Sequence, residues 1–299
     1  MLAYNFFEMT RQRRLGNSAI SLFLLALMGC ADDGPKNPSF AVTFSQAEHI
    51  LKSAEQKPQP LPRPLIIVGG FLDPGFSVSS LKGSFSQYTR DDRIIAIPLG
   101  YYSSFDECRQ VIVEAVDRRF PNHDPAQTTE VDVLGYSMGG LAARYAAADQ
   151  TTDGKSARRL NVVRLFTISS PMRGAHIAKN VGVDLNKLQN DMHPDSQFLA
   201  KLDAGPISPT HIFPVYSYVR LGDIGIGESN TAVNGQTPWW IATPPLELAH
   251  DAAFMDQRIL ADIVQRIYDR KPFSKDPPAN LPALPDGRLL VDHDVAASD

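Results

Sequence analysis

The sequence predicts an α/β fold, in which helices cover both faces of a mostly parallel β-sheet. Short apolar runs of strand length alternate with helical patterns along most of the chain. Several of these runs are apolar at every position, as strands buried on both faces require. The chain has 299 residues, 43% of them apolar, which is enough to bury a core of this kind. In such folds ligands bind at the carboxyl ends of the strands.

Five apolar runs predict the strands, at Leu65–Val68, Ile94–Ile97, 130–134, Val162–Ile168 and 212–219. Patterns of helical period lie between and after them, at 105–120, 138–149, within 174–202 and at 256–268. Alternation of this kind favours a layered domain with crossover connections. We place this domain at residues 64–270.

The charge balance excludes one class of partner. There are 29 basic and 33 acidic side chains, and the net charge is −4. A chain without an excess of basic residues lacks the electrostatic footprint of a nucleic-acid-binding protein. The two cysteines, Cys30 and Cys108, could form at most one bridge, so a disulfide framework is excluded. We interpret Cys108 as a small packing residue.

Residues 1–29 have the pattern of an export signal. Three arginines precede a ten-residue apolar run at 19–28. Ten helical residues reach only about half of the roughly 30 Å hydrocarbon core, so the run is too short to span a membrane. The box LMGC at 27–30 resembles the signal of bacterial lipoproteins, which implies that Cys30 carries the lipid. The alternative is a plain secretory signal that leaves Cys30 as a free thiol.

Lipid on Cys30 implies a protein anchored to a membrane of the bacterial cell envelope. Ala31, rather than aspartate, follows the cysteine, which favours the outer membrane over the inner one. Prolines alternate from Pro58 to Pro64, and we expect residues 30–63 to form a Pro-rich tether with a short helix at 45–56. A second Pro-rich segment, 271–299, is expected to form a C-terminal tail.

A nucleophile motif follows the third predicted strand. Gly135, Ser137 and Gly139 form a G-x-S-x-G pattern between that strand and an apolar helix. In a nucleophile elbow the serine occupies a strained turn, and the flanking glycines let strand and helix pack closely. We therefore interpret Ser137 as a nucleophile. The alternative is a serine that only caps the helix.

The segment GYSMGGLAARY closely resembles the nucleophile elbow of lipase-like α/β-hydrolases, of the bacterial triacylglycerol lipase and esterase type. Residues 167–175 resemble the segment after the next strand in that family, and residues 191–202 resemble its lid-region helix. The resemblance spans about residues 64–270. It implies an α/β-hydrolase fold with a lid or cap insertion at about 174–210.

A serine nucleophile needs a base, and the family's chain order is nucleophile, acid, histidine. Of seven histidines, this order demotes His49 and His123, and His293 lies in the Pro-rich tail. Three more precede the last plausible strand and leave little room for an acid before them, so His250, just before the last helical pattern, remains. The alternative is a solvated loop histidine. Asp223 is the candidate acid because it follows the fifth predicted strand, where a buried carboxylate could orient the imidazole. A surface-turn aspartate is the alternative reading, and Asp251 and Asp256 are rivals.

The oxyanion of the tetrahedral intermediate needs preorganised donors. One is expected to be the backbone N–H of Met138, directly after the nucleophile. The other is expected from the loop after the first strand, at the N–H of Phe71. The family commonly has His-Gly before this donor, whereas this chain has Gly69 and Gly70. A backbone donor needs no particular side chain, so the departure leaves the predicted function possible.

The sequence thus predicts a membrane-tethered serine hydrolase acting on an ester or lipid substrate, with no metal and no cofactor. The substrate alternatives are a lipase with a lid over an acyl groove and an esterase for short acyl chains. The functional alternative is a catalytically silent lipoprotein that keeps the hydrolase fold as a binding or scaffold module.

Overall fold

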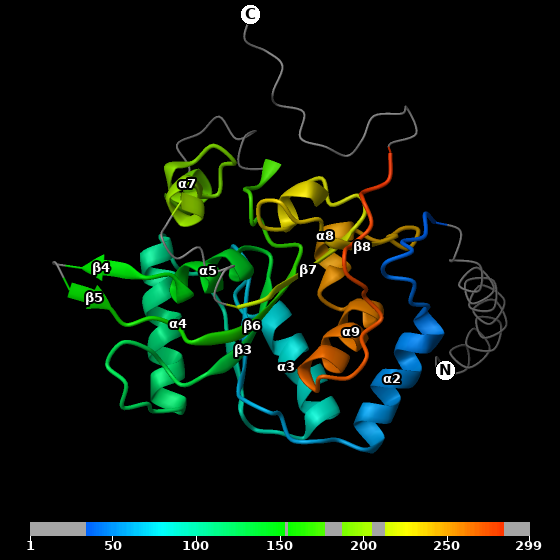
Figure 1. Cartoon of the computed structure of the whole chain (residues 1–299), viewed down its shortest axis with the longest axis horizontal. Helices are drawn as coiled ribbons and strands as arrows, with labels where there is room; N and C mark the ends of the chain where they lie inside the picture. The colour runs from blue at the N-terminus through cyan, green and yellow to red at the C-terminus, as the bar shows by residue number, and fades with distance from the viewer. Residues whose placement is uncertain (1–33, 153–154, 177–186, 205–212, 284–299) are drawn as a thin grey trace, which may run out of the picture.

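A six-stranded parallel sheet forms the centre of the protein (Figure 1). The computed structural model describes residues 34–152, 155–176, 187–204 and 213–283. The strands, in spatial order, are β2 (Ile94–Ile97), β1 (Leu65–Val68), β3 (Val131–Tyr136), β6 (Val162–Ile168), β7 (Val215–Arg220) and β8 (Trp239–Ile241). Every neighbouring pair is parallel. The predicted α/β fold is confirmed.

Helices cover both faces of this sheet. One face packs against α4 (Phe105–Arg119) and α5 (Met138–Ala147), and the other against α3 (Phe76–Thr89) and α9 (Gln257–Ile267). The helix α2 (Phe44–Gln56) lies outside α3 and α9 and packs on both. The shorter elements are β4 (Gln150–Thr152), β5 (Lys155–Ala157), α6 (Lys187–Asp191), α7 (Gln197–Ala204), a 3-10 helix (Glu228–Thr231) and α8 (Ala249–Ala253).

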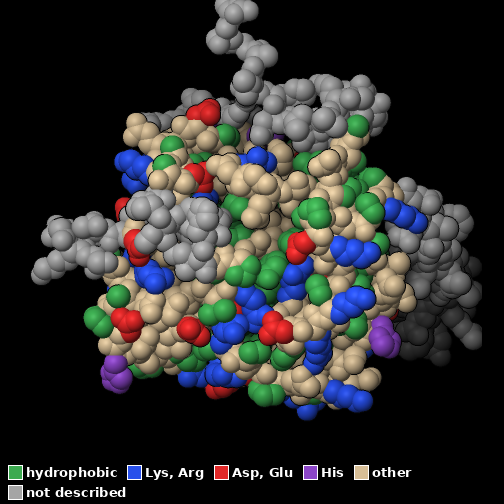
Figure 2. Space-filling model, in the orientation of Figure 1, with side chains coloured by type: hydrophobic (Ala, Val, Ile, Leu, Met, Phe, Trp, Pro, Cys, Tyr) green, Lys and Arg blue, Asp and Glu red, His purple; other side chains and the backbone are tan. Residues whose placement is uncertain are grey.

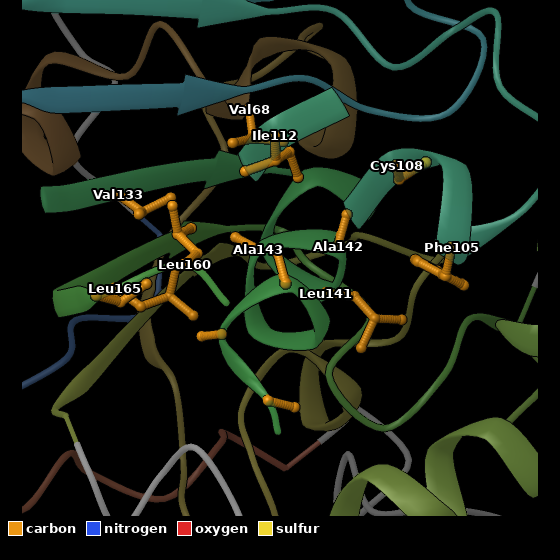
Figure 3. Packing of buried hydrophobic residues seen from close by; sticks show 14 of the residues in the cluster. Val68, Phe105, Cys108, Ile112, Val133, Leu141, Ala142, Ala143, Leu160 and Leu165 are labelled. Carbon is orange, nitrogen blue, oxygen red and sulfur yellow. The ribbon is translucent and has the colours of Figure 1, made fainter. Parts of the chain in front are cut away.

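The strand side chains alternate between two apolar cores. In β3, Val133 faces α4 and α5, whereas Leu134 faces the side of α3 and α9. Figure 3 shows the first of these cores, in which side chains of α5 such as Ala142 and Ala143 lie close to those of α4 and of the strands. Both faces of the sheet are therefore buried, which explains the continuous apolar runs in its strands.

The described part of the expected tether, residues 34–63, packs onto the domain instead of extending away from it. Ala47, Leu51 and Ala54 are buried, and their spacing places them on one face of α2. Thr43 begins the helix with a capping box shared with Gln46. The helix expected at 45–56 is therefore present as α2, but because its apolar stripe is buried against the domain, these residues do not form a free tether.

The described part of the expected C-terminal tail also packs onto the domain. The indole N–H of Trp239 donates to the carbonyl of Lys275 at 3.0 Å, and that of Trp240 to Asn280 at 3.1 Å. From the other terminus, the Asn37 amide donates to the Trp240 carbonyl at 2.9 Å. Both ends of the described chain thus cover the edge strand β8, which protects its unpaired backbone groups.

Two expectations fall on residues outside the described part of the chain. These are the export signal with Cys30, within residues 1–33, and the last residues of the tail, 284–299. Of the helices that the structure describes, none is long and apolar enough to cross a membrane. Over the face seen in Figure 2, Lys and Arg side chains alternate with Asp and Glu side chains, mainly in its lower half.

Candidate active site

Ser137 lies at the sharp turn between β3 and α5. Its φ of 52° is in the left-handed region, which is strained for a residue with a Cβ. A Cβ on Gly135 would lie 2.3 Å from Cα of Gly140, and one on Gly139 would lie 2.2 Å from the carbonyl oxygen of Val68. Only glycine fits at these two positions, so the geometry of the predicted elbow is present.

His250, on α8, lies between Ser137 and Asp223. Its Nε2 is 3.1 Å from Oγ of Ser137, and its Nδ1 is 2.9 Å from Oδ2 of Asp223. Because a carboxylate only accepts hydrogen bonds, Nδ1 carries the proton and Nε2 is free to accept one from the serine. The structure therefore brings the three predicted residues together in the order that proton abstraction requires.

The loop after β7 fixes the carboxylate of Asp223. The side chain of this aspartate is fully buried, and its Oδ1 accepts from the N–H of Ile226 at 3.3 Å. Gly222 and Gly227 have φ of 89° and 86°, and a Cβ on Gly227 would lie 2.4 Å from the ring of His176. These glycines thus let the loop fold tightly around the carboxylate.

The two alternative candidates for the catalytic acid, Asp256 and Asp251, do not bind the imidazole. Asp256 is buried and binds Arg220 and Arg258, and these two guanidinium groups outweigh burial and lower the pKa of its carboxyl. Asp251 is exposed and follows His250 directly in α8. Of the three candidates, Asp223 is the one hydrogen-bonded to the imidazole.

The surroundings of His250 raise its pKa above the ordinary value of 6.5. Burial alone lowers the pKa of the ring, but the hydrogen bond and charge of Asp223, together with the charge of Asp251, outweigh it. The ring of Tyr136 lies 5.5 Å from the imidazole, and its hydroxyl donates to the His250 carbonyl at 3.2 Å. Tyr136 thus restrains the backbone and one side of the ring.

The loop after β1 lies against the nucleophile. A Cβ on Gly70 would lie 3.0 Å from Cβ of Ser137, so a side chain here would crowd the serine. Phe71 is partly buried against the core that contains α5, and Met138 is buried in the first turn of that helix. Met138 thus follows Ser137 directly, and the contact of Gly70 with the serine places the backbone just before Phe71 beside the nucleophile.

Asp73 braces this loop, a role that the sequence analysis missed. Its Oδ1 accepts from the N–H groups of Gly75 and Phe76, at 2.9 and 2.8 Å, and its Oδ2 accepts from the N–H and hydroxyl of Ser77. These bonds tie the loop to the start of α3. The signal available in the sequence was an aspartate shortly before a possible helix.

The described part of the expected lid, about 174–210, packs on the domain. Leu188, Leu199 and Leu202 are buried in the core beside α4 and α5, and the ring of Phe198 stacks on Phe105 with centroids 4.4 Å apart. These apolar residues therefore serve core packing. Other apolar residues of the expected lid, Val181, Val183 and Leu185, lie outside the described residues.

Other reactive side chains stand apart from this site. Burial raises the pKa of the Cys108 thiol to about 12, so it is a packing residue and no thiolate nucleophile. His49 and His123 are exposed, His193 lies beside Asp195, and His211 and His293 fall outside the described residues. Among the residues described, no group of three His, Cys, Asp or Glu side chains could hold a metal ion.

Comparison with known proteins gives resemblances of fold at low identity. No family model and no curated protein matches the chain. The Bacillus licheniformis lipase BlEst2 in mature form is 12% identical with a TM-score of 0.46, and the match covers 72% of this chain and 94% of that one. A metagenomic carboxyl esterase is 10% identical with a TM-score of 0.47, and the match covers 71% and 77%.

Phospholipase PlaB from Legionella pneumophila is also similar, at 12% identity and a TM-score of 0.37. That match covers 54% of this chain but only 38% of PlaB, so this chain spans well under half of the phospholipase.

Proposed function

We propose that this protein is a serine hydrolase that cleaves carboxylic esters through an acyl-enzyme on Ser137. The observation that carries the proposal is the hydrogen-bonded line from Ser137 through His250 to Asp223, at the carboxyl ends of β3 and β7. A histidine between a strained serine and a buried carboxylate is the arrangement that activates a hydroxyl for acyl transfer. The same line favours an enzyme over a silent binding module.

In the first half of the reaction His250 Nε2 takes the proton of Ser137 as Oγ attacks the ester carbonyl carbon. The N–H groups of Phe71 and Met138 stabilise the oxyanion that forms. His250 then gives its proton to the leaving alkoxide, and the acyl group stays on Ser137. Asp223 holds Nδ1–H and stabilises the imidazolium in both transition states.

Water completes the cycle. His250 takes a proton from the water as it attacks the acyl-enzyme, and returns a proton to Ser137 as the carboxylic acid leaves. None of these steps draws on a metal or an organic cofactor. The site is thus complete with groups that the chain itself supplies.

The proposal includes a lipid anchor on Cys30 in the outer membrane of the cell envelope. Its support is the LMGC box after the basic and apolar parts of an export signal. We expect Cys30→Ser to abolish the incorporation of labelled fatty acid and to move the protein from the membrane fraction to the soluble one. Unchanged labelling and fractionation would refute the lipid anchor but would leave the proposed hydrolase activity unaffected.

A series of p-nitrophenyl esters of increasing acyl length tests the enzymatic proposal. We expect turnover by the chain lacking residues 1–30 and its loss in Ser137→Ala. Ser79→Ala removes an exposed hydroxyl on α3 and is the matched control, with unchanged turnover. Absence of turnover of any ester would favour the silent module. Preference for acetyl or butyryl esters without activation at an oil–water interface would identify an esterase and exclude a lipase.

A further inference from the structure

Exposed apolar side chains gather at the edge of the sheet that holds the candidate active site. The described part of the chain has seven large exposed ones, and all follow the carboxyl ends of β1, β2, β7 and β8. We call this set the apolar rim: Leu72, Phe76, Tyr101, Ile224, Leu246, Leu248 and Met255. Large exposed apolar side chains that are confined to one end of the parallel sheet, and not scattered over the molecule, indicate a surface that binds something.

Members of the apolar rim adjoin the catalytic residues. Ile224 follows Asp223 directly and is 86% exposed, and Leu248 lies two residues before His250. On the other side, a chain of rings leads from Phe76 to the histidine. Phe76 is 6.0 Å from Phe254, which is 5.0 Å from Tyr136, whose ring contacts the imidazole.

The described chain begins at this same edge. A Cβ on Gly34 would lie 2.6 Å from Cβ of Ala242, the residue that follows the carboxyl end of β8. Figure 1 shows the start of the described chain, in dark blue, beside β8, with α2 further from that edge. From Gly34 it is four residues back to Cys30. Four residues span at most about 14 Å even when fully extended.

Because residues 34–63 pack on the domain, only the short connection from Cys30 to Gly34 can separate the domain from the lipid anchor. A tether of thirty residues would let the domain turn freely, but a connection of four residues holds Ala242 and the neighbouring rim close to the anchored residue. The apolar edge and the anchored end of the chain therefore coincide.

We propose that the apolar rim docks on the same lipid leaflet that holds Cys30, so that the active site faces that leaflet and takes lipid esters from it. This inference rests on the proposed lipid anchor. The proposed binding partner of the apolar rim is the surface of the membrane that holds the anchor. A second copy of the chain on the rim is an outcome that the test distinguishes.

Nitroxide labels on the full-length lipidated protein test the orientation. The labels are placed at Leu248→Cys and Leu72→Cys in the rim and at Glu130→Cys, an exposed residue at the amino end of β3. The buried Cys108 does not compete for the label. All variants carry Ser137→Ala, so that the phosphatidylethanolamine and phosphatidylglycerol vesicles stay intact.

On vesicles we expect the labels at 248 and 72 to lose access to an aqueous nickel complex several-fold, relative to the chain lacking residues 1–30, while the label at 130 keeps it. Equal access at all three sites in the membrane-bound protein would overturn the proposal. Loss of access at 248 without vesicles, with a doubled particle mass, would overturn it in favour of a dimer. A lipidated chain that stays off the vesicles would also overturn it.

A longer connection tests the consequence for activity. An insertion of about 20 flexible residues between Asp33 and Gly34 lowers the effective concentration of the rim at the leaflet roughly tenfold. We expect hydrolysis of vesicle lipid to fall by that factor and turnover of a soluble ester to stay unchanged. Equal rates on vesicle lipid would contradict the short tether. Loss of turnover on both substrates, with the labels still protected, would refute the hydrolase and leave the orientation standing.

Discussion

At the residue scale, the buried carboxylate of Asp223 determines which nitrogen of His250 can act as the base. Asp223→Asn keeps the size of the side chain but can donate to Nδ1, which favours the wrong tautomer. We expect kcat for ester hydrolysis to fall roughly 10³- to 10⁴-fold, by analogy with the same change in other serine hydrolases. Asp251→Asn is the control, because its exposed carboxylate has no contact with the ring nitrogens, and its maximal kcat should be retained.

The raised pKa of His250 gives a pH dependence of defined sign. Only the neutral imidazole can accept the serine proton, so kcat/KM should rise with pH and reach half of its maximum above pH 6.5. The charge of Asp251 contributes to the raised pKa, so Asp251→Asn should move this midpoint to lower pH. A midpoint that moves upward in this variant, or does not move, would contradict the assignment of His250 as the base.

The sequence predicted Ser137, Asp223 and His250 because chain order and position after apolar runs leave few candidates. Asp73 escaped prediction because its role depends on where α3 begins, and no clear helical pattern marked that start. The buried partners of Asp256, Arg220 and Arg258, come together only in the folded chain. From the sequence alone, Asp256 therefore remained an alternative to Asp223 as the catalytic acid.

At the element scale, the close approach of β1, β3 and α5 depends on two glycines, Gly135 and Gly139. Gly139→Ala places a Cβ 2.2 Å from the Val68 carbonyl, so we expect lower stability toward urea and a large loss of turnover. Gly83→Ala, in α3, meets no atom within 4 Å and is the control. It should stabilise the protein by about 0.5–1 kcal/mol without altering turnover. A tolerated Gly139→Ala would contradict the packing of the elbow.

Strands with continuous apolar runs were predicted well, since β1, β2 and β6 begin and end as expected. The helix α3 was missed because its sequence is rich in serine and has only a weak apolar stripe. The short strand β8 is defined by pairing with β7, where Val219 lies opposite Trp240. Three residues carry too little periodicity for such a strand to be identified from sequence alone.

At the scale of the whole molecule, residues 34–63 belong to the packed domain. Leu51 of α2 is 4% exposed, and Leu51→Ala should lower the free energy of unfolding by about 2–4 kcal/mol in urea denaturation. Lys52→Ala, next to it on the exposed side, should change that free energy by no more than about 0.5 kcal/mol. Equal free energies of unfolding for the two variants would instead support the expected tether.

The helix within residues 34–63 was expected, but the alternating prolines led us to interpret the segment around it as a tether. The prolines lie in the short connection between α2 and β1. The position of the segment on the domain is determined by the apolar face of α2. The partner of that face, formed by α3 and α9, comes from distant parts of the sequence. Contacts of this range cannot be inferred from the segment itself.

The central claim is that His250 and Asp223 activate Ser137 for attack on an acyl carbon. The most direct measurement is reaction with a fluorophosphonate, followed by intact mass and mapping of the modified peptide. We predict one adduct on Ser137, none in Ser137→Ala, and labelling slowed by orders of magnitude in His250→Ala. An adduct on another residue, or labelling of Ser137→Ala at the rate of the unmodified chain, would contradict the account.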